Sequence, residues 1–479
     1  MKRVLCTNLL FASLVGCGDV GETPEEMTIG AQSSFLTADD GISTEALRTR
    51  REFSFTKVAA FGENTPSGEQ FKSYFVPHGL NDQGDTFFQS DTASGAHLFR
   101  LRAHQPAEQF AGKGQPAPGG GLYTDGVMSI GTAMNQDGDA VFKYLLDVAE
   151  TESLPTGRHQ GVFRVDAGRR PITLVRPGVT LAPNGQPFLG THMYSGINRS
   201  RDVVFSGIIQ TSKGIKAPPE PDLGLGMGVF KADAAGSITS IVSPGDPAPG
   251  RGVFDFAQNG FINDRGDVVF GGHIAGETCH TFGSKQAERI FCAESVYIYR
   301  KSTGRIVSIA HQGEHAPGGG NYFLAYGPAL NNQGDVVFIG DFSPPPAVLT
   351  KSGVFLWSHG STVAVARPGD AMPGGGHMVA ASPFVQGYSI NDRGEVFFFA
   401  TLDTDKDGDS KNDSGVFVWK DGTTRLILRS GTKLPGLGTV SLVSDGWGYG
   451  SAVSNNHGEV LTYITTTAGN GYLVKATPQ

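Results

Sequence analysis

The sequence predicts an all-β protein, a seven-bladed β-propeller of four-stranded blades, from three observations. A short Asn-x-x-Gly pattern returns seven times along the 479 residues. Runs of β-branched and aromatic residues follow each copy and favour strands, while the Gly and Pro residues around them favour turns. No long stretch shows helical periodicity. The repeats matter because a chain longer than ~300 residues rarely forms one domain unless it is modular.

The Asn-x-x-Gly copies are separated by 54, 63, 65, 68, 60 and 64 residues. They begin at Asn81, Asn135, Asn198, Asn263, Asn331, Asn391 and Asn455. Asn hydrogen-bonds to its own backbone two residues on, and the Gly accepts a left-handed conformation, so each copy predicts a tight hairpin with a bulge. The third copy has Arg201 in place of Gly, so its hairpin must carry left-handed strain or open differently. We interpret the acidic residue after the Gly as a solvated turn cap.

Each repeat predicts four strands. A β-rich run such as 172–175 leads into a Gly/Pro loop and a second strand, then come the Asn pattern and a third strand, and a Gly-Val-Phe strand ends the unit. Runs such as 267–270 are almost entirely apolar after their first residue, which predicts strands buried on both faces. Radial repetition leaves few exposed sheet edges and favours a ring. The sequence does not say which strands close it.

The Gly/Pro loops have two interpretations. Gly-rich backbone can bind anions, but it also forms turns that simply shape the fold. The residue after the first Gly of each loop varies along the chain: Glu63, Gln115, Val179, Asp246, Glu314, Asp370 and Thr432. A repeated ligand site would not vary so freely, so we interpret these loops as structural turns.

The repeat resembles that of a family of bacterial surface proteins, the choice-of-anchor NxxGxxxFxA repeat proteins. The resemblance covers roughly residues 54–476 and rests on the Phe four residues after the Gly position: Phe88, Phe142, Phe205, Phe270, Phe338 and Phe398. The seventh copy departs, with Leu461 and Thr462 at this place. The resemblance implies an exported and anchored propeller, and it implies no activity.

The first residues are typical of a bacterial signal peptide. Lys2 and Arg3 give a positive start, and the mostly apolar run that follows is too short to span a bilayer, which takes ~20 residues. The run ends in Leu-Val-Gly before Cys17, which resembles the bacterial lipobox. This resemblance implies cleavage before Cys17 and attachment of lipid to its thiol. The alternative is an ordinary signal peptide that ends near a cysteine.

The chain therefore divides into three parts. Residues 1–16 are the predicted lipoprotein signal peptide, 17–53 a flexible polar tether, and 54–479 the seven-repeat propeller. We expect the protein on the extracytoplasmic side of the cell envelope, either periplasmic or on the outer surface. The lipid would be its membrane anchor, because no later apolar run is long enough to span a bilayer.

Two further cysteines, Cys279 and Cys292, have twelve residues between them. In an oxidising compartment such a pair predicts a loop disulfide. Two free thiols or a metal-binding pair are the alternatives. Zinc is disfavoured because only His280 stands beside them and no second cysteine pair exists.

One acidic segment predicts a calcium site. Its carboxylates follow at alternate positions around Gly408, as in the first half of an EF-hand loop. The candidate ligands are Asp403, Asp405, Asp407, Asp409 and Asp413. The end of the loop departs from the pattern, because Ser414 stands where a bidentate Glu is usual. A solvated acidic loop is the alternative, but carboxylates this close repel one another without a cation.

Charge and motifs limit the function. A net charge of −8 gives no basic patch for nucleic acid, and no helical zinc motif or Gly-x-Ser-x-Gly nucleophile motif occurs. We therefore expect a monomeric, non-enzymatic binding module for a glycan or a surface protein. The alternative is an extracytoplasmic hydrolase or lyase that acts on a glycan, with its site in the central funnel.

Overall fold

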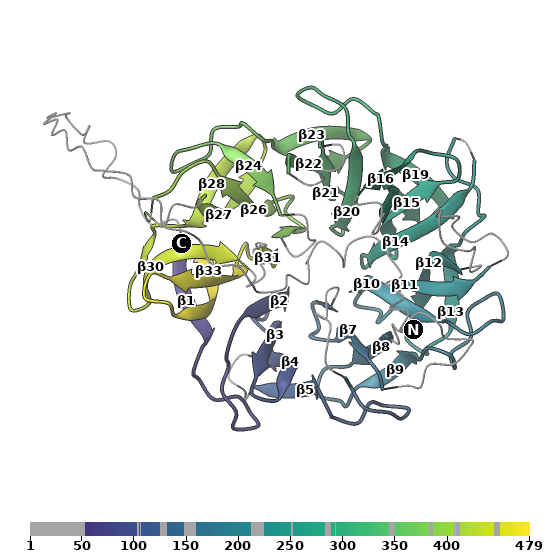
Figure 1. Cartoon of the computed structure of the whole chain (residues 1–479), viewed down its shortest axis with the longest axis horizontal. Helices are drawn as coiled ribbons and strands as arrows, with labels where there is room; N and C mark the ends of the chain where they lie inside the picture. Colours follow the sequence, from purple (N-terminus) through teal and green to yellow (C-terminus); the bar gives the residue numbers. More distant parts are fainter. Residues whose placement is uncertain are drawn as a thin grey trace, which may run out of the picture.

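Strands arranged in seven sheets around one axis make up the protein, which is described by a computed structural model (Figure 1). The structure describes residues 53–102, 105, 107–124, 132–147, 160–211, 225–250, 252–282, 289–292, 294–343, 350–382, 387–406, 408, 412–444 and 451–479. Within these residues every long element is a strand. The fold is a seven-bladed β-propeller of four-stranded blades, as the repeats predict.

In each blade the strands follow one another from the axis to the rim. The first blade contains β2 (Phe75–Leu80), β3 (Thr86–Thr92), β4 (Gly95–Leu101) and β5 (Glu108–Gly112). The second contains β6 (Ala133–Met134), β7 (Ala140–Leu145), β8 (Gln160–Val165) and β9 (Ile172–Val175). The third contains β10 (Gly190–Ile197), β11 (Val203–Gln210), β12 (Leu225–Ala232) and β13 (Ile238–Val242).

The next three blades keep this order with small additions. The fourth contains β14 (Phe254–Ile262), β15 (Val268–Ile274), β18 (Ser295–Arg300) and β19 (Arg305–Ala310), with the separate hairpin β16 (Cys279–Phe282) and β17 (Arg289–Cys292). The fifth contains β20 (Leu324–Leu330), β21 (Val336–Asp341), β22 (Ser352–Ser358) and β23 (Ser361–Ala366). The sixth contains β24 (Met378–Ala381) and β25 (Tyr388–Ile390), which share the inner position, then β26 (Val396–Leu402), β27 (Ser414–Lys420) and β28 (Thr423–Arg429).

The seventh blade joins the two ends of the repeat array. It contains β29 (Lys433–Leu434), β30 (Gly438–Ser444), β31 (Val453–Ser454), β32 (Val460–Thr466) and β33 (Gly471–Pro478), and β1 (Phe53–Ala60) supplies its outermost strand. β1 pairs antiparallel with β33, with Phe53 opposite Pro478 and Ala60 opposite Tyr472. The N-terminal strand therefore closes the ring.

This closure shows that the sequence repeat and the blade are offset by one strand. The β-rich run that opens each repeat is the outer strand of the preceding blade, and the Gly/Pro loop after it leads to the inner strand of the next blade. The first such run along the chain is β1, so it has no blade before it and pairs with the last one. The chain thus links every pair of adjacent blades, and the ring is closed within the seventh blade by the backbone hydrogen bonds between β1 and β33.

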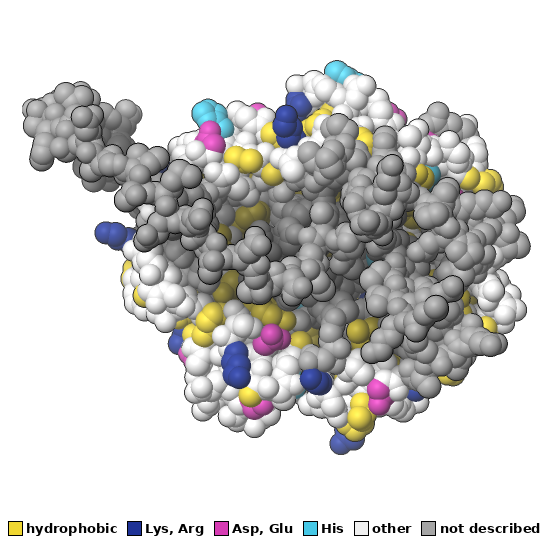
Figure 2. Space-filling model, in the orientation of Figure 1, with side chains coloured by type: hydrophobic (Ala, Val, Ile, Leu, Met, Phe, Trp, Pro, Cys, Tyr) yellow, Lys and Arg dark blue, Asp and Glu magenta, His cyan; other side chains and the backbone are white. Residues whose placement is uncertain are grey.

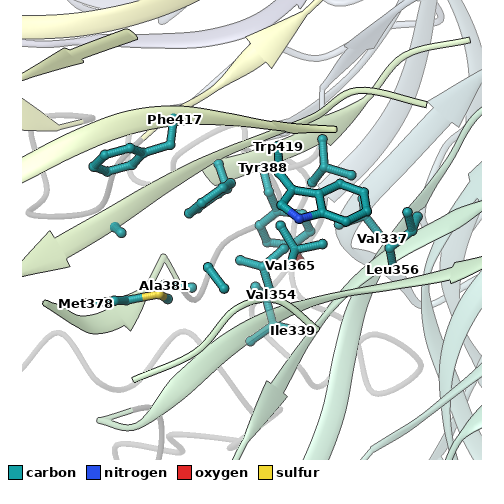
Figure 3. Packing of buried hydrophobic residues seen from close by; sticks show 14 of the residues in the cluster. Val337, Ile339, Val354, Leu356, Val365, Met378, Ala381, Tyr388, Phe417 and Trp419 are labelled. Carbon is teal, nitrogen blue, oxygen red and sulfur yellow. The ribbon is translucent and has the colours of Figure 1, made fainter. Parts of the chain in front are cut away.

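Apolar side chains fill the space between adjacent blades. In β3, Phe88 packs toward the seventh blade and Phe87 toward the second, so both faces of the strand are buried. Figure 3 shows one of these interfaces, where Val337 and Leu356 of the fifth blade face Tyr388 and Trp419 of the sixth. The strands predicted to be buried on both faces are confirmed, because each lies between two packed sheets.

Two aromatic positions of the repeat, which are far apart in each unit's sequence, contact each other in the structure. The Phe after each Asn pattern lies directly opposite the aromatic residue of the Gly-Val-Phe strand, and their rings stack. The pairs are Phe88–Phe99, Phe142–Phe163, Phe205–Phe230, Phe270–Tyr297, Phe338–Phe355 and Phe398–Phe417. In the seventh blade Thr462 lies opposite Val474, so this blade has no aromatic pair at the equivalent position.

Candidate functional site

The inner strands end at the Asn patterns, which together surround one mouth of the central channel. A hollow of ≈ 230 Å³ opens there. The residue before each Asn lines its wall: Leu80, Met134, Ile197, Ile262, Leu330, Ile390 and Ser454. Polar groups of the hairpins line its rim, among them Asp264, Asn332 and Asp392. The mouth therefore combines aliphatic side chains in its wall with polar groups that supply most of its accessible surface.

Each Asn pattern is the predicted hairpin, and it also binds the next blade. Within the second copy, Oδ1 of Asn135 accepts hydrogen bonds from the backbone N–H groups of Asp137 and Asp139. Its Nδ2 donates to the backbone carbonyl of Asn198 in the third blade, at 2.9 Å. The same bond to the next Asn carbonyl recurs from Asn198, Asn263, Asn331, Asn391 and Asn455, at 3.0–3.2 Å. Asn81 reaches the carbonyl of Gln136 instead, at 3.4 Å, so these side chains form a belt around the axis.

The residue after each Asn forms a second ring at the mouth. Its backbone N–H donates to the side-chain oxygen of the equivalent residue in the next blade, at 2.7–2.8 Å. The chain of donors runs from Arg199 through Asp264, Asn332, Asp392, Asn456 and Asp82 to Gln136. Within the described residues the ring is interrupted between Gln136 and Arg199, because a guanidinium group offers no acceptor. The rim carboxylates are thus held by backbone donors of the neighbouring blades.

In four of the seven copies the acidic residue after the Gly position is not the solvated cap that the sequence predicts. Asp139, Asp202, Asp267 and Glu395 are buried. Burial alone would raise the pKa of Asp139, but hydrogen bonds from Ala167, Arg201 and Asn135 outweigh it and hold this pKa below its usual range. Asp139 and Glu395 accept hydrogen bonds from the belt Asn, whereas Asp202 and Asp267 pair with Lys231 and Arg300 at the third strand of their own blades.

Arg201 shows how the third hairpin forms without a Gly. Its φ is 62°, so the residue adopts the left-handed conformation, and its N–H still donates to the carbonyl of Asn198. The side chain of Arg201 forms ion pairs with Asp139 at 2.9 Å and with Asp166 at 3.7 Å. The hairpin therefore carries the strain, and the guanidinium contributes contacts to the second blade in return.

At the opposite ends of the inner strands lie the Gly/Pro loops. Their backbone carbonyls accept hydrogen bonds from Arg side chains at the end of the same blade's outer strand: Arg176 to Gly120, Arg367 to Gly319 and Arg429 to Gly375. The loops entering the second, fifth and sixth blades contain three consecutive Gly residues, and these are the blades that carry the Arg. Exposed carbonyls bound by Arg favour the interpretation of the loops as structural turns.

The predicted calcium loop joins β26 to β27. Asp403 accepts hydrogen bonds from His377, including one from Nδ1 at 3.0 Å, and Asp405 accepts one from the N–H of Gly408. Asp413 is buried and forms an ion pair with Arg429 at 2.8 Å. Asp407 and Asp409 lie outside the described residues. Two of the five candidate ligands therefore already have cationic or imidazole partners within the chain.

The two later cysteines form the predicted disulfide. Cys279 and Cys292 face each other across the β16–β17 hairpin and are bonded. Nε2 of His273 lies 3.8 Å from the Cys279 sulfur, but disulfide sulfurs are poor metal ligands, so this His–Cys–Cys group is a structural link. Cys17 lies outside the described residues. No helix within the described part of the chain is long and apolar enough to cross a membrane.

The belt is the feature that sequence reasoning missed. The local pattern identifies each Asn as a turn residue of its own hairpin, and the repetition of the copies predicts the number of blades. In a closed ring, equivalent positions of adjacent blades lie side by side around the axis. A polar side chain repeated at one such position can therefore bond to its own copies, and this is the signal that could have found the belt.

The architecture and the belt define this protein as a β-propeller whose blades are linked by repeated asparagines at one mouth of the channel. The chain belongs to a family of unknown function, DUF7453, which it matches over residues 31–296 and again over residues 290–472. No curated protein matches the chain.

Solved structures similar to the chain include a β-propeller domain and two enzymes. The β-propeller domain of the Trilobed protease from Pyrococcus furiosus is 10% identical, with 85% of this chain and 93% of that domain covered and a TM-score of 0.44. A PL25 ulvan lyase, a polysaccharide lyase, is 12% identical, with 88% and 96% covered and a TM-score of 0.45. Pyrococcus horikoshii acylaminoacyl peptidase is 10% identical, with 82% of this chain but 51% of the peptidase covered and a TM-score of 0.44. Likenesses of this degree carry no argument about activity.

Proposed function

We propose that this protein is a non-enzymatic binding module, held by lipid on Cys17 at the extracytoplasmic side of the bacterial cell envelope, where it acts as a monomer. The observation that carries the proposal is the hollow at the channel mouth, which is lined by fixed polar groups of the hairpins and by aliphatic side chains of the inner strands. Loops on a rigid scaffold that present fixed polar groups around a hollow are suited to binding. One oxygen of each rim carboxylate accepts a backbone N–H from the neighbouring blade, which fixes the position in which the carboxylate would meet a ligand.

A glycan or a surface protein is the proposed ligand. The Cys279–Cys292 disulfide supports an oxidising location outside the cytoplasm. On the face in Figure 2, the Lys and Arg side chains of the described residues stand apart from one another, which gives no support to a nucleic-acid partner. A hollow of ≈ 230 Å³ is suited to one sugar unit or one side chain of a partner, rather than to a long polymer.

The test is a binding screen of the purified chain against a glycan array and against envelope extracts. Leu330→Trp would fill the hollow from its wall, and Leu442→Trp adds the same side chain at an exposed position outside it. We expect binding that Leu330→Trp abolishes and Leu442→Trp preserves. Equal binding by both variants would place the ligand elsewhere and overturn the proposal. Release of shortened glycan by the unmodified chain would instead support the hydrolase or lyase alternative.

A further inference from the structure

Glu294 is a carboxylate buried inside the fourth blade, apart from the mouth of the channel and from the acidic loop. It directly precedes β18 and is 2% exposed, and its backbone carbonyl accepts a hydrogen bond from Ala325 of the fifth blade. Oε1 accepts a hydrogen bond from Gln258 on the inner strand β14. Oε2 has no hydrogen-bond partner among the described residues. One oxygen of a buried carboxylate is thus left unsatisfied.

Two amide oxygens next to Glu294 are unsatisfied as well. Oε1 of Gln258 and Oδ1 of Asn259 have no partner among the described residues, and both side chains are buried. Adjacent residues of a regular strand face opposite sides. Here the register of β14 against β15 shifts after Gln258, and Asn259 has a φ of 59°. The shift brings both amides against Glu294.

The backbone of Asn259 is strained where it makes this contact. The other three non-Gly residues with positive φ, which are Arg201, His359 and Asp421, lie in turns between strands, whereas Asn259 lies within a strand. A left-handed residue other than Gly costs about 1–3 kcal/mol and persists where the surroundings require it. In this conformation the backbone N–H of Asn259 donates to Oγ of Ser206 in the third blade, at 2.9 Å, and the side-chain amide lies beside the carboxylate.

The carboxylate of Glu294 occupies space in the fourth blade that is free because residue 271 is a glycine. A Cβ atom at Gly271 would stand 1.9 Å from Oε2 of Glu294. The equivalent positions of the adjacent blades, after the same Val-Val-Phe run, carry Ser206 and Ile339. The space for Glu294 is therefore a particular feature of this blade and not of the repeat.

No cationic side chain compensates this carboxylate. Burial raises the pKa of Glu294 to about 7, although Gln258, His273 and Asn259 act to lower it, and neither Lys nor Arg is among the groups that affect it. The imidazole of His273 is bonded through Nδ1 to Asp255, at 2.8 Å. An ionised carboxylate without a partner is costly in the interior, by several kcal/mol.

We propose that Glu294, Gln258 and Asn259 form a binding site for a hard metal cation of the calcium class, inside the ring between the fourth and fifth blades. Calcium prefers carboxylate and amide oxygens, with six to eight ligands in all, so water and backbone carbonyls complete the set. An amide that donates to the carboxylate in the cation-free chain needs only to turn over to offer its oxygen. The site is separate from the Asp403–Asp413 loop of the sixth blade.

The test compares calcium binding in variants of the whole chain after chelation. Calorimetry and thermal unfolding are measured with Ca²⁺, Mg²⁺ and Na⁺ for the unmodified chain, Glu294→Gln, Gly271→Ala and the loop variant Asp405→Ala. Gly271→Ala keeps every proposed ligand, but its methyl group occupies the position of Oε2 of Glu294. It serves as the second variant if Glu294→Gln does not fold. We expect both to weaken Ca²⁺ binding at this site at least ~10-fold, while Asp405→Ala retains it.

The sign of the stability change distinguishes a cation site from an ordinary buried carboxylate. Without Ca²⁺, Glu294→Gln should unfold at the same temperature as the unmodified chain or at a higher one, because it removes an uncompensated charge. With saturating Ca²⁺ it should unfold at a lower temperature, because it loses the bound ion. A calcium response that Glu294→Gln retains, one lost only in Asp405→Ala, or none at millimolar Ca²⁺ would each overturn the proposal.

Discussion

Nδ2 of Asn455 donates a hydrogen bond to the backbone carbonyl of Asn81, 3.0 Å away and 374 positions apart in the sequence. Asn455 also accepts bonds from the N–H groups of His457 and Glu459. Asn455→Leu would leave these buried groups unpaired, and we expect a loss of about 3 kcal/mol in the free energy of unfolding, measured with urea. Asn184→Ala, at an exposed turn, is the control and should cost less than about 1 kcal/mol. Equal effects would mean that the belt adds no stability.

The ring closure predicts a specific role for β1. Removing residues 1–60 deletes the outer strand of the seventh blade and exposes the edge of β33. We expect a loss of about 4 kcal/mol and a tendency to aggregate, from the lost backbone pairs and the burial of Phe53 and Ala59. Removing only residues 1–52 keeps β1 and should leave stability unchanged. Thermal unfolding and gel filtration compare the two, and identical behaviour would contradict closure by β1.

His78 predicts a pH dependence. Burial lowers its pKa to about 3, and neither ring nitrogen has a partner among the described residues. The folded protein therefore keeps this ring neutral, while the unfolded chain takes up a proton below about pH 6.5. Its contribution is fully present above that pH and is lost as the pH falls toward 3, by up to ~1.4 kcal/mol per pH unit. Urea unfolding between about pH 7 and pH 4.5 should show a shallower slope for His78→Leu, and parallel slopes would refute this.

The disulfide should stabilise the arm formed by β16 and β17. Replacing both Cys279 and Cys292 by Ser removes a link with a sequence separation of 13. We expect a loss of up to about 3 kcal/mol, because the reduced hairpin gains freedom when it unfolds. Reductant should have the same effect on the unmodified chain and none on the double variant. An unmodified chain whose unfolding ignores reductant would argue against this role.

The acidic loop remains a predicted calcium site, with a smaller ligand set than the sequence alone offered. Because Asp413 is paired with Arg429 and Asp403 with His377, we expect Asp405, Asp407 and Asp409 to contribute most of the binding. Calorimetric titration with Ca²⁺ should give heat that Asp405→Ala reduces. Asp421→Asn removes a charge from another turn of the same blade and should leave the heat unchanged. Null heats in both the unmodified chain and Asp405→Ala would remove the site.

Sequence patterns predicted what is decided within one blade. A hairpin of this kind needs only an Asn that bonds to its own backbone and a residue that accepts positive φ. Asn135 and Gly138 meet both needs, so the sequence alone predicts this hairpin. The stacked pair Phe142 and Phe163 follows from strands joined in sequence. Cys279 and Cys292 could be paired because they are the cysteines left in one short loop.

The sequence by itself thus determined the blades, their number and the chemistry of their turns, because these depend on neighbours along the chain. Only the tertiary structure decided which strand seals the ring and which Asn bonds to which, since those contacts join residues up to 374 positions apart. It also decided that Asp413 faces Arg429 and that Glu294 lies against Gln258. The partners come from different segments of the chain, and their contact depends on register and bulges that no local pattern records.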